Sequence, residues 1–264
     1  MSDNEFPDDD HPFLGDGDAD ALEEAYMGVL NGNPRTCVEM FRMEVTAFEY
    51  ICQVLWDTLI MEPTERSELE ESLAIFCLIV GHGQGQRVVA DRFQHSTETI
   101  NRHVKTVTRA VHELGRSVIR HTHTVGVHPY IASNRHNYPW FQNCLGAMDG
   151  TMISAAAPAH LGNAYRNRHG RVAENVLCAC DFDMNFTYVY TGWEGTAHDA
   201  RIFLDALSRP DNQFTWPAPG YYYLVDAAFP CIEMFMLPYP RERYHRSDRY
   251  NEDGFWGYKD YFNY

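Results

Sequence analysis

The hydrophobic pattern of this chain changes partway along its length, and that change limits the folds it can adopt. Over residues 41–114 apolar residues recur at steps of three and four, which is the spacing of amphipathic helices. Beyond residue 143 the apolar runs are short, rich in β-branched and aromatic residues, and bounded by turn residues, as in strands. The sequence therefore predicts an α/β protein in which a helical region precedes a mixed sheet.

Acidic residues are concentrated at the start of the chain. Residues 1–24 contain ten Asp and Glu side chains and no Lys or Arg, within a formal net charge of -16 for the whole chain. Such a segment repels itself and buries little apolar surface, so we expect a disordered acidic tail over residues 1–34. The acidic balance argues against strong nonspecific DNA binding by the chain as a whole. We find no secretory signal and no apolar run long enough to cross a bilayer, so we expect no membrane partner.

A helical domain is expected over residues 35–120. Its predicted helices cover residues 41–60, 65–80 and 86–93, and a longer helix follows, capped by Ser96. A tight turn at Gln94 and His95 joins the last two, which makes them a helix-turn-helix candidate. The exposed start of the longer helix would offer DNA the polar side chains of Asn101, Arg102 and Lys105. Packing of the same two helices as a hairpin within a bundle is at least as good an interpretation.

A connector containing His, Pro and Gly is expected over residues 121–140, and a mixed-sheet domain over residues 141–264. Residues 144–155 form one predicted strand, and residues 174–195 form two more around a turn at residues 183–185. A helix then begins near Asp199, and a later strand ends at Asp226.

Three acidic residues stand out because of their positions in these elements. Asp149 lies inside an apolar strand, Asp199 opens a helix and Asp226 ends a strand. Strand ends and helix N-termini converge on one side of an α/β sheet, and carboxylates that converge there repel unless a cation neutralises them. Oxygen ligands favour Mg²⁺ or Mn²⁺, and two such ions activate water and stabilise the leaving oxygen of a phosphodiester. The alternatives are structural: a strand-end turn, an acid favoured by the helix dipole, and a turn cap.

Several motifs resemble one protein family in the family's own order. "LGAMDGT", "YRNRHG", "NVLCACDFDMNFTYVYTGWEGTAHDARIF" and "YYLVDAAFP" resemble the nuclease domain of PIF/Harbinger transposases and their host-adopted relatives. "GQRVVADRFQHSTETINRHV" resembles the helix-turn-helix region before that domain in plant members. The resemblance implies an RNase H-like fold and a DDE-type, divalent-metal-dependent nuclease that acts on DNA. By motif, Asp149 matches the first acid, Asp199 the acid of the "HD" motif, and Asp226 the acid that ends the later strand. Which of the last two is the second catalytic carboxylate stays open, although strand topology favours Asp226.

The resemblance also implies a final glutamate on a late helix, and this sequence ends at "YFNY" without a match for it. We therefore expect a nuclease domain that is incomplete at its C-terminus and impaired in catalysis. A basic cluster near the predicted site, formed by Arg166, Arg168 and Arg171, would bind phosphates or be a solvated loop.

Two functions are consistent with these patterns. The first is a transposase-derived, metal-dependent endonuclease in the nucleus, in which the three aspartates hold Mg²⁺ or Mn²⁺ and DNA is the substrate. The second is a catalytically inactive domesticated transposase that acts as an interaction module on chromatin. Either function is compatible with a separate DNA-binding or chromatin partner protein.

Overall fold

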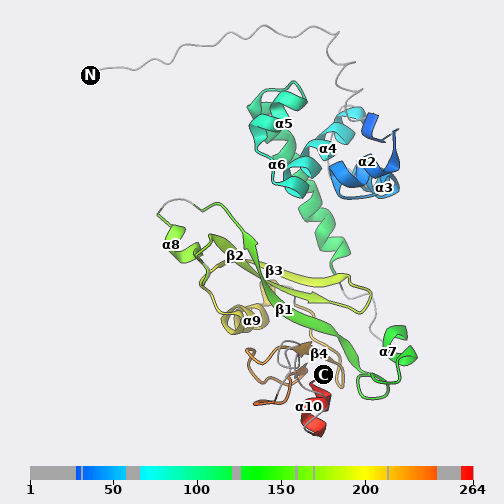
Figure 1. Cartoon of the computed structure of the whole chain (residues 1–264), viewed down its shortest axis with the longest axis vertical. Coiled ribbons are helices and arrows are strands. Elements are labelled where there is room, and N and C mark those ends of the chain that lie inside the picture. Colours follow the sequence, from blue (N-terminus) through cyan, green and yellow to red (C-terminus); the bar gives the residue numbers. More distant parts are fainter. Residues whose placement is uncertain are drawn as a thin grey trace. The chain divides into compact units, whose positions relative to one another are not determined.

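The computed structural model describes residues 28–30, 32–57, 66–120, 126–157, 160–168, 170–212, 214–242 and 257–263. Most of the predicted acidic tail, residues 1–27, lies outside these ranges. The chain divides into two compact units, Met1–Ser117 and Val118–Tyr264, which are described separately below (Figure 1). In the first unit residues 28–30 are already helical and the next helix begins at Pro34, so ordered structure starts earlier than the sequence predicted.

The first unit is helical. Its helices are α2 (Pro34–Phe41), α3 (Val45–Asp57), α4 (Arg66–His82), α5 (Gln86–Arg92) and α6 (Thr97–Val118). The helix predicted over residues 41–60 is present as α3, but it begins only at Val45, because Arg42 adopts a left-handed conformation (φ 61°) that ends α2. Residues 58–60 lie outside the described ranges. The apolar stripe nevertheless forms one core: Phe41 stacks on Phe48 with 5.1 Å between ring centroids, and both are buried.

The predicted short helix, tight turn and long helix are confirmed as α5, residues 93–96 and α6. Gln94 takes a left-handed conformation in the turn (φ 50°), and the Ser96 hydroxyl accepts a hydrogen bond from Thr99 N at 3.1 Å, which caps α6. One face of α6 packs in the core through Ile100, His103, Val107 and Ala110. The opposite face presents Arg102 and Lys105 to solvent, with Asn101 half-buried beside them.

The second unit is built on a five-stranded mixed sheet with the strand order β3-β2-β1-β4-β5. The strands are β1 (Cys144–Ser154), β2 (Ala173–Cys180), β3 (Phe186–Glu194), β4 (Tyr222–Val225) and β5 (Phe235–Met236). β1 pairs antiparallel with β2 and parallel with β4, so it lies at the centre of the sheet. The unit also contains α7 (Pro129–Ser133), α8 (Gly162–Tyr165), α9 (Asp199–Ser208), the 3-10 helix η1 (Pro210–Asn212) and α10 (Tyr258–Phe262).

Local turn chemistry produces the hairpin that the sequence predicted between β2 and β3. The Asp181 carboxylate accepts hydrogen bonds from the backbone N–H groups of Asp183 and Asn185, and Met184 has a positive φ of 65°. The predicted connector contains an element that was not expected, because His128 caps the short helix α7 by accepting a hydrogen bond from Tyr130 N at 3.2 Å.

Helix α9 covers one face of the sheet (Figure 1). Its Ile202 and Phe203 are fully buried and share a core with Met148 of β1 and Val225 of β4. The Phe203 ring makes edge-to-face contacts with neighbouring rings, at 5.1 Å from Phe229 and 4.7 Å from Phe235. These contacts settle which residues of β1 and β4 face α9 and which face away from it.

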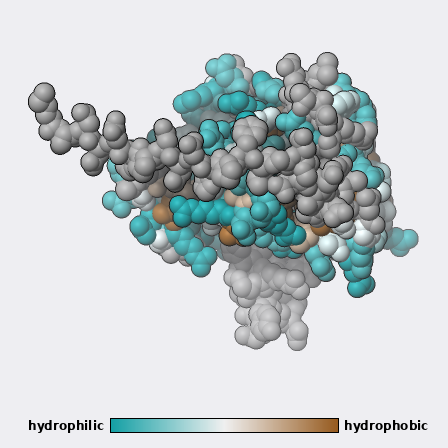
Figure 2. Space-filling model, turned by 90° about the horizontal axis from the view of Figure 1, so that it is seen from above, coloured by the Kyte–Doolittle hydropathy of each residue, from teal (hydrophilic) through white to brown (hydrophobic). Residues whose placement is uncertain are grey.

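Hydrophilic residues dominate the described surface on the side seen in Figure 2, where hydrophobic residues occupy only small areas. None of the helices in the described ranges combines the length and the apolar character that a membrane crossing needs.

Candidate active site

Asp149 and Asp226 are brought together by the parallel pairing of β1 with β4. Met148 and Val225 are the last partners in this ladder, and both side chains are buried beneath α9. The next residue of each strand is Asp149 and Asp226. Because successive side chains of a strand point to opposite faces, Asp149 points away from α9, and Asp226 follows β4 on the neighbouring strand.

The charge of Asp149 is destabilised in this position. The side chain remains in contact with solvent, but its partial burial against the sheet raises the pKa of the carboxyl above the ordinary value of 3.8. A hydrogen bond from Gly150 N at 2.8 Å opposes this rise, while the negative charges of Asp226 and Asp199 add to it. A nearby cation would offset both the cost of burying this charge and its repulsion by Asp226 and Asp199.

Asp199 approaches β1 from the other face of the sheet. It is the first residue of α9 and lies against Gly150, where a Cβ atom would come within 2.3 Å of its Oδ1. The same Oδ1 accepts a hydrogen bond of 2.6 Å from Asn175 Nδ2, a buried group of β2 that also donates to Ala197 O at 3.0 Å. The glycine therefore opens a space in β1 that the Asp199 carboxylate fills, and one oxygen of that carboxylate is already engaged.

Asp226 has its own backbone partner. Its Oδ1 accepts a hydrogen bond of 2.7 Å from Ala228 N, which shapes the turn after β4. Asp226 therefore caps the turn after β4, the structural role that the sequence offered for it, and Asp199 is held at the start of α9. Each carboxylate keeps a second oxygen that no described hydrogen bond uses.

The three aspartates fit a divalent cation in donor chemistry and in part in geometry. All three offer hard carboxylate oxygens, which Mg²⁺ and Mn²⁺ prefer. In the described part of the chain, however, they do not form a group whose ligand atoms all lie within 4.8 Å of one another. Asp199 lies on the other face of β1 and is held there by Asn175, which keeps it apart from the other two. Asp149 and Asp226 are neighbours across the β1–β4 ladder, and of the two other aspartates Asp226 has the larger effect on the pKa of Asp149.

Sequence reasoning missed two residues of this site. Asn175, which donates a hydrogen bond to Asp199, is the only amide side chain in the mostly apolar run "AENVLCAC". A polar residue at such a position in the sequence could have indicated a role in the site. Cys178 lies directly opposite Asp149 in the β1–β2 ladder, and burial, with added repulsion from Cys180 and Asp149, raises the pKa of its thiol. The position of Cys178 beside Asp149 could be seen only from the register of β1 with β2.

The predicted basic cluster lies between α8 and β2. Arg166 donates to Gly170 O at 2.7 Å, and Arg166 and Arg168 are exposed. Arg171 lines a pocket with Met152 and Ser154 at the end of β1, together with Asn167 and Ala173. The pocket begins three residues beyond Asp149 on the same strand, but Met152 and Ser154 alternate with Asp149 and therefore lie on the opposite face of the sheet. Asn101, Arg102 and Lys105 belong to the helical unit.

Two family models match segments of the chain. Residues 23–113 match a domain of unknown function, DUF8040, which covers α2 to α5 and most of α6. No curated protein and no solved structure matches the chain. Residues 148–253, which carry Asp149, Asp199 and Asp226 on the mixed sheet, match the model of the DDE superfamily endonucleases.

Proposed function

We propose that this chain is a transposase-derived endonuclease of the PIF/Harbinger type, which uses Mg²⁺ or Mn²⁺ to cleave DNA phosphodiesters in the nucleus. One observation carries the proposal: Asp149 and Asp226 stand side by side at the end of the β1–β4 ladder, inside the segment that matches the endonuclease family. The raised pKa of Asp149 supports it, because clustered carboxylates with perturbed pKa values are typical of functional sites.

The chain's own residues position the acids. Gly150 N orients Asp149, Ala228 N orients Asp226, and Asn175 orients Asp199 through one oxygen only. In each case the second carboxylate oxygen is left to coordinate a cation. When bound, the cation would supply an activated water and charge stabilisation at the leaving oxygen. Asp149 and Asp226 are the principal ligands in this proposal, and Asp199, which approaches β1 from the face of α9, would have to reach past Gly150 to join them.

DNA would be held mainly by its phosphates. Arg171 lines the pocket at the end of β1, and Arg166 and Arg168 are exposed in the same segment of the chain. The helix-turn-helix candidate would add Arg102 and Lys105, which are exposed, and the adjacent Asn101. Because the chain is acidic overall, we expect weak and strongly salt-dependent binding unless a separate DNA-binding or chromatin partner contributes.

Cleavage of supercoiled plasmid in Mg²⁺ or Mn²⁺ tests the proposal. In keeping with the impaired catalysis expected from the sequence, we expect little nicked product from the wild-type chain. We expect none from Asp149→Asn or Asp226→Asn, which keep the side-chain shape and remove the charge. Asp211→Asn changes an exposed acid of η1 in the same unit and serves as the matched control. Cleavage that persists undiminished in Asp149→Asn would overturn the assignment of this site.

A separate measurement distinguishes the catalytically inactive alternative. If Mn²⁺ raises the melting temperature of the wild-type chain and not that of Asp149→Asn, the carboxylates bind metal whether or not they cleave. Metal binding without cleavage would favour an adopted transposase that acts as an interaction module on chromatin.

A further inference from the structure

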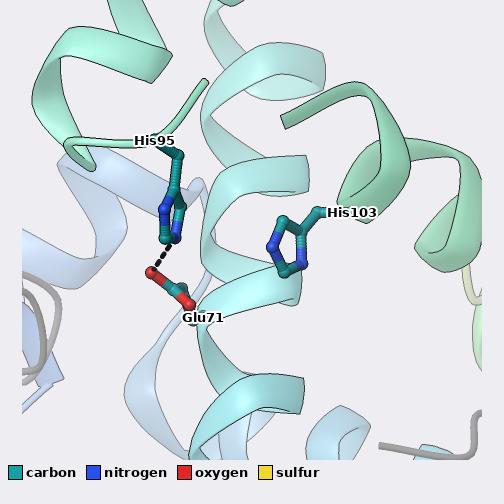
Figure 3. A group of neighbouring side chains, drawn as sticks. All are labelled: Glu71, His95 and His103. Atoms are coloured by element: carbon teal, nitrogen blue, oxygen red, sulfur yellow. Dashed lines mark hydrogen bonds and ion pairs between the residues drawn. The ribbon is translucent and has the colours of Figure 1, made fainter. Parts of the chain in front are cut away.

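A second group of metal-ligating side chains lies in the helical unit. Glu71 of α4, His95 of the α5–α6 turn and His103 of α6 converge from three segments of the chain (Figure 3). One ligand atom from each lies within 4.8 Å of those of the other two. Glu71 Oε1 is 3.0 Å from His95 Nε2, and the two imidazole rings stack with 5.7 Å between their centroids.

The hydrogen bonds of Ser72 determine which nitrogen of His103 is available. The Ser72 hydroxyl donates its only proton to Glu68 O at 2.7 Å. It also lies 2.7 Å from His103 Nδ1, so it must accept the Nδ1 proton of that ring. The neutral imidazole then has an unprotonated Nε2, and no described hydrogen bond occupies that atom. Ser72 therefore acts as the outer hydrogen-bond partner that fixes the tautomer of many metal-binding histidines.

The surroundings favour metal binding at this cluster. His103 is 7% exposed, and burial is the main reason that the pKa of its imidazole is lowered, which keeps the ring neutral. The side chains of His95 and Glu71 are 24% and 16% exposed, so the cluster is sheltered but still open to solvent on one side. A cation could therefore enter and retain a water ligand.

We propose that Glu71, His95 and His103 form a binding site for a transition-metal cation of the Zn²⁺ type, with water in the fourth position. Two imidazoles and one carboxylate suit Zn²⁺ better than Mg²⁺, which prefers oxygen ligands. With metal–ligand bonds of about 2.0–2.1 Å, neighbouring ligands of tetrahedral Zn²⁺ lie about 3.3 Å apart. The 3.0 Å separation of Glu71 from His95 is close to this, and small side-chain rotations would bring in His103.

The role of this site would be to fasten α4 to the α5–α6 turn. His95 lies in the turn and His103 lies two helical turns into α6, so one cation would fix the start of α6 against α4. In the helix-turn-helix candidate this clamp would set the orientation of the exposed Arg102 and Lys105. The inference does not depend on the proposed endonuclease, because its ligands and its measurements are separate from the three aspartates.

Zinc titration of the full chain tests the site directly. The chain carries Asp149→Asn to weaken the carboxylate site, is stripped with a chelator, and is titrated with Zn²⁺ by calorimetry. We expect one tight equivalent, which His95→Gln and Glu71→Gln each abolish. His112→Gln replaces a histidine of α6 whose side chain is 71% exposed, and it should bind like the parent chain.

Two further readouts separate ligation from a structural role. Ser72→Ala leaves the three ligands in place and removes the group that orients His103, so it should weaken Zn²⁺ binding by about 10–100-fold without abolishing it. Zn²⁺ should raise the melting temperature of the helical unit by about 5 °C or more, and His95→Gln should remove that rise. The inference is overturned if the parent chain binds no Zn²⁺, or if His95→Gln, with an unchanged circular dichroism spectrum, binds it as well as His112→Gln does.

Discussion

Replacing Gly150 with Ala adds one methyl group at the point where Asp199 lies against β1. The new Cβ would meet Asp199 Oδ1 at 2.3 Å and Cγ at 2.6 Å, distances that real contacts do not reach. Asp199 cannot retreat easily, because it begins α9 and the following Ile202 and Phe203 are fully buried. The carboxylate must therefore rotate and break its hydrogen bond to Asn175.

Two effects of opposite sign decide the stability of this variant. Gly150 has no left-handed backbone that Ala would strain, so the reduced freedom of the unfolded chain alone predicts stabilisation by about 0.4–1 kcal/mol. Against this, a hydrogen bond to a charged group contributes about 1.5–3 kcal/mol, and an extra methyl in a packed site costs about 1–3 kcal/mol. The steric effect dominates, and we expect net destabilisation of about 2–4 kcal/mol.

Thermal unfolding of the full chain, followed at the transition of the sheet-containing unit, measures this effect. The expected decrease in melting temperature is about 5–15 °C for a unit of this size. Gly162→Ala is the matched control: nothing lies within 4 Å of its added Cβ, so it should be neutral or slightly stabilising. In an Asp199→Ala background the same Gly150→Ala change should lose most of its effect. An equal loss of stability in both backgrounds would refute the proposed contact.

Three further outcomes follow from single sites. Since the pKa of Asp149 is raised in the folded chain, the folded state retains that proton to higher pH than the unfolded state, and its contribution to stability falls as pH rises above 3.8. In the presence of a chelator, Asp149→Asn should therefore have a higher melting temperature than the wild type at pH 7, and this difference should shrink toward pH 3.8. A difference that does not change with pH would contradict the prediction. Ser96→Ala removes the cap on Thr99 N and should lower the stability of the helical unit by about 1 kcal/mol in urea unfolding, whereas no change would mean that water replaces the cap. Phe203→Ala should destabilise the sheet unit by about 3–5 kcal/mol in the same assay, and a loss below 1 kcal/mol would show that the aromatic core collapses around the gap.

Much of the secondary structure was predictable because its signals are local. The spacing of apolar residues marked α4 and α6, and the turn residues Asp183–Asn185 separated β2 from β3. Strand β1 and the strand before Asp226 were recognised from short apolar runs, and Ser96 was recognised as a cap. Periodicity failed at Arg42, where one left-handed residue divides an apolar stripe that looks continuous in the sequence. The conformation of one residue does not change the spacing of apolar residues in the sequence, so this spacing could not reveal where α2 ends.

The chemical sites depended on contacts between residues that are distant in the chain. The sequence identified Asp149, Asp199 and Asp226 as candidates, but only the parallel β1–β4 register places Asp149 beside Asp226, and only packing of α9 places Asp199 beneath Gly150. Glu71, His95 and His103 have no recognisable ligand spacing, and they meet because α4 and α6 share a core. Local patterns determine which element a residue belongs to, since they reflect the period of the backbone. The neighbours of that residue across the fold are decided by how the buried faces of those elements pack together.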